Sequence, residues 1–132
     1  MYGNGLSLTI IRGNVTADPE MKFTPGGQAR TTLRVAVNKR FKDRDGNKKE
    51  EVSFLPITCW GNLAERVHEW VKRGQEITVV GELRQDRWTN DEGKNMSFVY
   101  VHADRLDFGD KAKGKEEDTP SEPEPVEELI NF

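Results

Sequence analysis

Apolar residues recur at every second position of the segment 31–41, and this alternation constrains the fold more than any other feature of the sequence. Leu33, Val35 and Val37 are each separated by a single residue. A period of two is typical of a strand with one buried face. Four further segments are rich in the β-branched and apolar residues of strands: 6–15, 52–60, 76–88 and 95–108. The sequence therefore predicts five strands.

One segment has the spacing of a helix instead. Leu63, Val67, Trp70 and Val71 recur at i, i+4, i+7 and i+8 within 61–74, which places them on one face of a short helix. We expect this apolar stripe to pack on the core, with Trp70 as part of it.

Turn residues separate the strands at 18–28, 42–51 and 89–94. Two residues inside strands also carry information. Pro56 lacks a backbone donor, so it predicts an edge position or a bulge. Gly81 predicts a bend or bulge in the fourth strand.

The expected order is three strands, a helix and two strands. It predicts an all-β protein with the OB-fold, a five-stranded barrel with one α-helix between strands 3 and 4. An SH3-like barrel or a β-sandwich would accommodate the strands, but neither expects an amphipathic helix at that point. We assign the barrel to residues 1–108. Residues 109–126 have the composition of a disordered linker, and 127–132 form an acidic and apolar tip.

Charge is distributed unevenly along the chain. Residues 109–132 contain three Lys and eight Asp or Glu, a net of −5, so the first 108 residues carry +2 of the total of −3. A basic body with an acidic tail suggests a domain that binds polyanions and a separate interaction segment. The chain starts without the features of a signal peptide, and its apolar runs are too short to span a membrane. We expect a cytoplasmic protein that does not contact membranes.

The sequence gives little reason to expect catalysis. It has one cysteine, Cys59, which allows no internal disulfide. No grouping of nucleophile and base, and no phosphate-binding loop, has the required spacing. We expect no enzyme activity, no metal and no cofactor.

Aromatic residues next to cations are the strongest functional signal. Phe41 is surrounded by Lys39, Arg40, Lys42 and Arg44, and such neighbours need water. Exposed rings beside cations bind unpaired nucleobases by stacking, with Lys or Arg holding phosphates. Phe54, Trp60 and Trp88, near strand ends or basic residues, are further candidates for stacking. The alternative is that all four rings belong to the core.

These residues occur in stretches that resemble a known family. The stretches are "GNVTADPEMKFTPGGQA", "TLRVAVNKRFKDRDG", "WGNLAERVHEWVKRGQEITVVGELRQDRW" and "FVYVHADRLDF". They resemble bacterial single-stranded DNA-binding proteins over about residues 5–108. The resemblance implies an OB-fold that assembles as a homotetramer and wraps single-stranded DNA with little regard to sequence.

The resemblance also implies roles for particular residues. Phe41, Phe54, Trp60 and Trp88 fall at the base-stacking positions of the family. The expected phosphate ligands are Lys39, Arg40, Lys42, Arg44, Arg73 and Arg84. Asn62 and Asp86 stand where basic residues are common in the family, and Asp86 would repel phosphate.

The end of the sequence resembles the partner-binding tip of the same family. The residues that fit this role are Glu127, Glu128, Leu129, Ile130 and Phe132, and Asn131 stands where the family usually has proline. The resemblance implies that this tip recruits replication and repair proteins.

The expected function is therefore to coat single-stranded DNA in replication, recombination and repair, in the nucleoid of the cytoplasm. Two alternatives stay open at this stage. One is an OB-fold module that makes protein contacts in a replication assembly. The other is an OB domain that binds RNA.

Overall fold

The computed structural model describes residues 4–108 and 128–129. Its centre is a barrel of five strands, lying in the spatial order β1-β5-β6-β4-β3 and closed by pairing of β1 with β3. β4 and β6 are parallel neighbours, and the other pairs are antiparallel. The strands are β1 (Thr9–Val15), β3 (Ala29–Lys42), β4 (Lys48–Trp60), β5 (Glu76–Thr89) and β6 (Asn95–Phe108).

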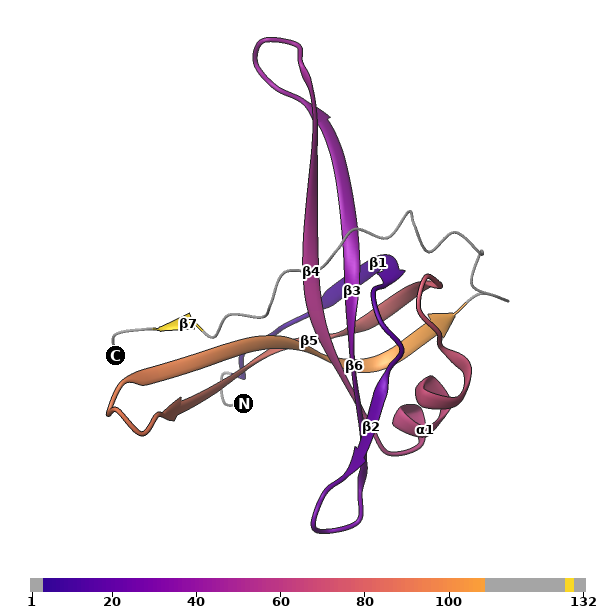
Figure 1. Ribbon diagram of the computed structural model, residues 1–132, viewed down its shortest axis with the longest axis vertical. Helices are drawn as coiled ribbons and strands as arrows, with labels where there is room; N and C mark the ends of the chain where they lie inside the picture. The colour runs from indigo at the N-terminus through magenta and orange to yellow at the C-terminus, as the bar shows by residue number, and fades with distance from the viewer. Residues whose placement is uncertain (1–3, 109–127, 130–132) are drawn as a thin grey trace.

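The helix α1 (Gly61–Trp70) lies between β4 and β5 and beside the barrel in Figure 1. This is the predicted OB-fold-like arrangement, so the expected fold class is confirmed. Within the described residues, no helix is long and apolar enough to cross a membrane.

Two short strands were not predicted. β2 (Glu20–Phe23) lies where only turns were expected and pairs with the beginning of β3. It is four residues long and lies between turn residues, so it has too few positions to show a period. β7 (Glu128–Leu129) pairs with Met96 and Ser97 of β6. The predicted linker, 109–126, and the rest of the predicted tip, 127 and 130–132, lie outside the described residues.

The core consists of small and medium apolar side chains from the inward face of each strand. Alternating residues of β3, β4, β5 and β6 supply it, because successive side chains of a strand point to opposite faces of the sheet. Val15, Val35, Ile57, Val79 and Val101 are exposed by 2% or less.

The helix is shorter than predicted, and Trp70 is not in the core. The helix ends at Trp70, and the side chain of this residue is 59% exposed. The buried stripe contains Ala64, Val67 and Val71. At 100° per residue Trp70 is turned well away from the centre of that stripe. The expectation that Trp70 packs in the core was therefore wrong.

Gly81 lies at a bulge, as predicted. The register of β5 against β6 shifts between Val80 and Gly81. A Cβ atom on Gly81 would collide with the carbonyl oxygen of His102. The close approach of the two backbones therefore requires glycine at this position.

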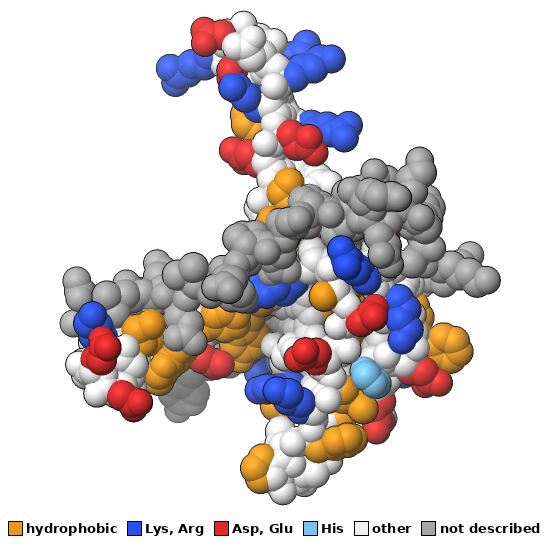
Figure 2. All heavy atoms as spheres, viewed as in Figure 1, with side chains coloured by type: hydrophobic (Ala, Val, Ile, Leu, Met, Phe, Trp, Pro, Cys, Tyr) orange, Lys and Arg blue, Asp and Glu red, His pale blue; other side chains and the backbone are white. Residues whose placement is uncertain are grey.

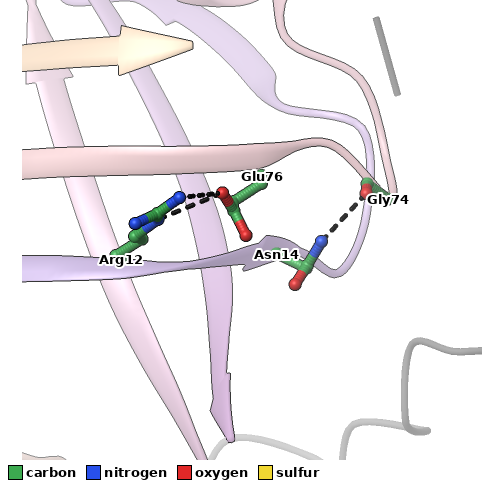
Figure 3. A network of polar contacts seen from close by, with 4 residues as sticks. All are labelled: Arg12, Asn14, Gly74 and Glu76. Carbon is green, nitrogen blue, oxygen red and sulfur yellow. Dashed lines mark hydrogen bonds and ion pairs between the residues drawn. The ribbon is translucent and has the colours of Figure 1, made fainter. Parts of the chain in front are cut away.

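The turn after α1 and the first residue of β5 are joined to β1 by polar contacts (Figure 3). The Arg12 guanidinium donates from two nitrogens to Oε1 of Glu76, at 3.0 and 2.8 Å. The Asn14 Nδ2 donates to the Gly74 carbonyl oxygen at 3.1 Å. Gly74 has a φ of 87° and donates its N–H to Val15. These contacts fix where β5 begins beside β1.

Two hairpins extend beyond the barrel (Figure 1). The β3–β4 ladder continues without a break to the pair of Lys42 with Lys48. We call its outer part, residues 38–52, the β3–β4 arm. The β5–β6 hairpin extends in another direction and ends at the pair of Thr89 with Asn95. The outer parts of the two hairpins supply no residue of the hydrophobic core cluster, and β7 pairs with Met96 and Ser97 of the second hairpin.

Candidate nucleic-acid interface

One face of the β3–β4 ladder carries aromatic rings and arginines. Trp60 is opposite Arg30, Pro56 is opposite Arg34, and Phe54 lies on the same side of β4. The alternate residues of β4, such as Ile57, point into the core. Phe54 and Trp60 therefore lie on the outer face, and both are half-buried rather than enclosed.

The outer face continues onto the β5–β6 hairpin through the parallel pair of Thr58 with His102. Trp88, Asp86 and Arg84 are on this side of β5, opposite Met96, Phe98 and Tyr100 of β6 respectively. Trp88 is 36% exposed. We call the continuous outer side of the two ladders the aromatic face. Its rings are Phe54, Trp60, Trp88, Phe98 and Tyr100.

A cation lies against one of these rings. The Cζ atom of Arg30 is 5.9 Å from the centroid of Trp60. At this distance the guanidinium is attracted by the face of the ring. The exposed guanidinium and the half-buried ring together present a flat surface and a positive charge at the same point.

The charge of Arg84 is partly compensated on the protein itself. Its guanidinium donates to Glu82 at 2.7 Å and forms an ion pair with the same carboxylate. The hydrogen bond that Arg84 donates to Glu82 is the main reason why the pKa of Arg84 is raised. Arg84 is therefore close to the rings, but a phosphate would have to compete with Glu82 for it.

Asp86 adds a second negative charge on the aromatic face. Its Oδ1 accepts a hydrogen bond from the Tyr100 hydroxyl at 3.4 Å. Partial burial and then the Asp86 carboxylate raise the pKa of Tyr100. The acidic residue that the sequence analysis singled out thus has a partner on the adjacent strand.

A recess of about 270 Å³ opens on the aromatic face. Its walls come from the β1–β2 connection, β2, β3, β4 and β6. Its polar and aromatic lining residues are Asp18, Glu20, Thr32, Arg34, Thr58 and Phe98.

Phe41 lies apart from the other predicted rings. It is opposite Lys49, on the side of the β3–β4 ladder that leads to the core residues Val35 and Leu33 rather than to Phe54. It is 38% exposed because the arm has left the barrel by this point. A second recess surrounds it, lined by Arg40, Phe41, Lys42, Lys48, Lys49 and Glu50.

The predicted phosphate ligands fall into three places. Lys39, Arg40, Lys42 and Arg44 belong to the arm and its turn. Lys and Arg side chains gather at the end of this arm in Figure 2. Arg40 is 3.8 Å from Glu50, and both side chains are largely exposed.

Arg73 lies in the turn between α1 and β5, where its backbone N–H donates to Asp18 at 2.9 Å. Arg84 is on the aromatic face, as described above. Asn62, which was flagged as a departure from the family, is exposed on α1. The structure therefore brings Arg84 to the rings and leaves the arm cations with Phe41.

Sequence reasoning missed four residues of the aromatic face: Arg30, Arg34, Phe98 and Tyr100. The signal for the two rings was present, because Phe98 and Tyr100 alternate with Val99 and Val101 in one strand. Which side of β6 faces water could be decided only from the register of β6 with β5. Arg30 and Arg34 gave no local signal, since isolated arginines on a strand are ordinary surface residues.

The described residues contain no group of three or more His, Cys, Asp and Glu that could hold a metal ion. Cys59 is buried, and burial raises the pKa of its thiol to about 12. It therefore lacks the thiolate character of a reactive cysteine.

The five-stranded barrel, with its helix between β4 and β5, places the chain in the class of OB-fold proteins, which often bind oligonucleotides. Comparison with known families gives a match to the single-strand binding protein family over residues 6–109. The chain belongs to this family. Membership agrees with the expectation that the chain is not an enzyme.

Curated relatives support the assignment. The chain is 36% identical over 98 residues to the single-stranded DNA-binding protein of Deinococcus radiodurans, covering 74% of the chain and 32% of that protein. It is 34% identical over 102 residues to the protein of the same name from Helicobacter pylori, covering 77% and 57%. The chain thus spans about a third of the first relative and a little over half of the second.

Solved structures share the fold. A Plasmodium falciparum SSB in complex with ssDNA superimposes with a TM-score of 0.77 at 21% identity, over 83% of this chain and 100% of that one. A deletion mutant of the single-stranded DNA binding protein from Thermus aquaticus gives a TM-score of 0.74 at 32% identity, over 84% and 53%.

Proposed function

We propose that the chain binds single-stranded DNA with little sequence preference and protects it during replication, recombination and repair. The observation that carries this proposal is the aromatic face, where rings and arginines from two hairpins share one side of the sheet. Bases stack on Phe54, Trp60 and Trp88, and on Phe41 where the strand crosses the arm. The phosphates meet Lys39, Arg40, Lys42, Arg44, Arg73 and Arg84.

Tolerance of sequence follows from the chemistry of these groups. Every base has a flat face, so stacking contributes roughly 1–3 kcal/mol per base with little regard to its identity. Phosphate contacts position the strand and carry no sequence information. Because the β3–β4 arm and the β5–β6 hairpin extend in different directions, a strand that contacts both has to curve around the barrel.

A titration with oligothymidylate tests this proposal. Base stacking on Trp60 and Trp88 should quench the tryptophan fluorescence, and the affinity should fall with salt by about 0.7 log units per log unit of salt for each phosphate contact. An unchanged spectrum at low salt would rule out binding through these rings. Competition with oligouridylate separates DNA binding from RNA binding.

We further propose that the chain assembles as a homotetramer. Leu6 and Leu8, which precede β1, and Ile10 within it are exposed by 97%, 70% and 66%, and Leu83 and Val99 form a second exposed apolar surface. Within the described residues, β1 pairs with β5 from Thr9 to Asn14 but with β3 only at Asn14 and Val15. An unpaired, apolar strand edge is a surface that proteins normally cover.

Two distinct apolar surfaces fit a tetramer with dihedral symmetry, since such an assembly needs two different two-fold interfaces. Light scattering of the purified protein, with and without oligothymidylate, gives its mass directly. A monomer at micromolar concentration would contradict the proposal.

The segment 127–132 is proposed to recruit replication and repair proteins, and the protein to act in the nucleoid of the cytoplasm. The support for recruitment is its sequence, in which acidic residues precede Leu129, Ile130 and Phe132. Acidic groups steer basic partners, and apolar side chains then occupy a pocket. Loss of partner capture by a Phe132→Ala variant that still binds oligothymidylate would support this role.

A further inference from the structure

Two aromatic rings of β6, those of Phe98 and Tyr100, do not pack in the core. Ser97, Val101 and Ala103 supply the inward side of this strand and are 5% exposed or less. Phe98 and Tyr100 are on the other side, among polar groups of β5. Within the described residues, α1 packs on the inward side, where its Ala64 carbonyl oxygen accepts a hydrogen bond from Thr31. No helix in this part of the chain therefore covers the two rings.

The two rings lie together and are nearly parallel. Their centroids are 6.2 Å apart, and the angle between their planes is 19°. The hydroxyl of Tyr100 donates to Asp86 on the adjacent strand, which restricts the tilt of the ring. Pre-ordered rings of this kind lose little conformational freedom when a flat ligand binds.

Their position joins the two groups of rings already described. Thr58 of β4, two residues before Trp60, is paired with His102 of β6, two residues beyond Tyr100, and Arg84 of β5 is opposite Tyr100. Trp88 is on the same side of β5 as Arg84, four residues further along the strand. A strand of DNA that contacts Trp60 and Trp88 thus has Phe98 and Tyr100 in between.

The recess beside Phe98 favours a base over a phosphate. Asp18 and Glu20 line it and would repel a phosphate group. A nucleobase is neutral, and the hydroxyls of Thr32 and Thr58 and the guanidinium of Arg34 line the same recess. The phosphate of the same nucleotide can remain outside, near Arg30.

We propose that Phe98 and Tyr100 form an additional stacking platform for the nucleobases of single-stranded DNA, with the recess beside Phe98 receiving one base. This inference rests on the proposed function and extends it to a site between the predicted rings. It makes Phe98 and Tyr100 binding residues, although they were not among the residues expected from the family.

Substitutions that remove the flat ring but keep an apolar side chain test the platform. Phe98→Leu and Tyr100→Leu should each weaken binding of a short oligothymidylate by about 5- to 150-fold, which corresponds to the loss of one stacked base. Tyr100→Phe should bind like the unaltered protein, because it keeps the ring and loses only the hydroxyl. Phe23→Leu is the matched control, since Phe23 is 62% exposed but lies on β2, on the inward side of its pair with Ala29.

Photocrosslinking of the unaltered protein gives a second readout that does not depend on a variant folding. An oligothymidylate with 5-iododeoxyuridine at single positions should yield adducts on Phe98 or Tyr100, identified by mass spectrometry. Binding of Phe98→Leu and Tyr100→Leu with undiminished affinity, together with adducts at Trp60 and Trp88 only, would overturn the platform and leave the proposed function intact. No binding by the unaltered protein would overturn both.

Discussion

Single side chains on the aromatic face determine how much positive charge it offers to DNA. The guanidinium of Arg84 lies opposite Tyr100 and on the same side of β5 as Trp88, yet Glu82 accepts its hydrogen bond at 2.7 Å. Asp86 adds a negative charge beside the same rings. Because Glu82 and Asp86 offset the positive charge near the rings, we expect base stacking to contribute more to affinity here than phosphate contacts do.

Removing the partner of Arg84 should strengthen DNA binding. In Glu82→Gln the guanidinium loses its ion pair and becomes available to a phosphate. We expect tighter binding of oligothymidylate and a salt dependence steeper by about 0.7 in the log–log slope, measured by fluorescence titration. Glu92→Gln is the control, because Glu92 pairs with Lys94 at 3.6 Å in the β5–β6 turn. An equal effect of both changes would mean that net charge, rather than Arg84, is responsible.

Cys59 should make the stability of the fold depend on alkaline pH. Burial raises the pKa of its thiol from 9.0 to about 12, so above pH 9 the unfolded chain releases a proton that the folded chain retains. Stability from this group is therefore complete below pH 9 and falls as the pH rises toward 12. Chemical denaturation across this range should show a shallower decline for Cys59→Ala. Parallel declines in the two proteins would contradict the assignment.

At the scale of elements, the close approach of two strands inside the barrel serves stability, whereas a hairpin that leaves the barrel serves binding. The bulge at Gly81 brings β5 against β6 inside the barrel. The β3–β4 arm leaves the barrel altogether, and its outer residues are exposed on both sides of the ladder. Substitutions at the Gly81 bulge should affect the stability of the fold, and substitutions in the β3–β4 arm should affect DNA binding.

Gly81→Ala should destabilise the fold. The added methyl group would overlap the His102 carbonyl oxygen, so the two strands must move apart, which typically costs about 1–3 kcal/mol. Urea denaturation measures the loss. Gly5→Ala is the control, because nothing lies within 4 Å of a Cβ atom at Gly5. Equal stability of Gly81→Ala and the unaltered protein would contradict the close approach.

Shortening the arm should weaken DNA binding without affecting the core. Replacing residues 41–49 by Asn-Gly removes Phe41 and four cations outside the core, which are Lys42, Arg44, Lys48 and Lys49. Thermal unfolding should be nearly unchanged, while oligothymidylate affinity and its salt dependence should both fall. Unchanged affinity would show that DNA does not reach the arm.

At the scale of the whole molecule, the two apolar surfaces lie on opposite sides of β5. Ile10 is opposite Val80, and Leu83 is opposite the buried Val101. If each surface forms its own two-fold interface, a single substitution should leave the other interface intact. The assembly can therefore be taken apart in steps.

We expect Leu8→Asp and Leu83→Asp each to give dimers, and the double variant to give monomers. Both side chains are more than half exposed in the single chain, so neither change removes a core contact. Light scattering measures the masses. Trp70→Asp, at a position exposed to 59% on α1, should stay a tetramer. Dissociation of this control to the same extent would contradict the proposed surfaces.

The sequence alone determined the five barrel strands, the helix between the third and fourth of them, and the presence of rings beside cations. These features depend on local periods and on side-chain chemistry, which neighbouring residues reveal. The bulge at Gly81 was also predictable, since a glycine within a strand often marks a bulge.

Only the tertiary structure decided which of these residues share a face. It separated Phe41 from Phe54, exposed Trp70, paired Arg84 with Glu82, and placed Phe98 and Tyr100 between Trp60 and Trp88. Such relations depend on the register between strands distant in the chain and on the direction in which each hairpin leaves the barrel. A shift of one residue moves every side chain to the other face, and no local pattern records the register.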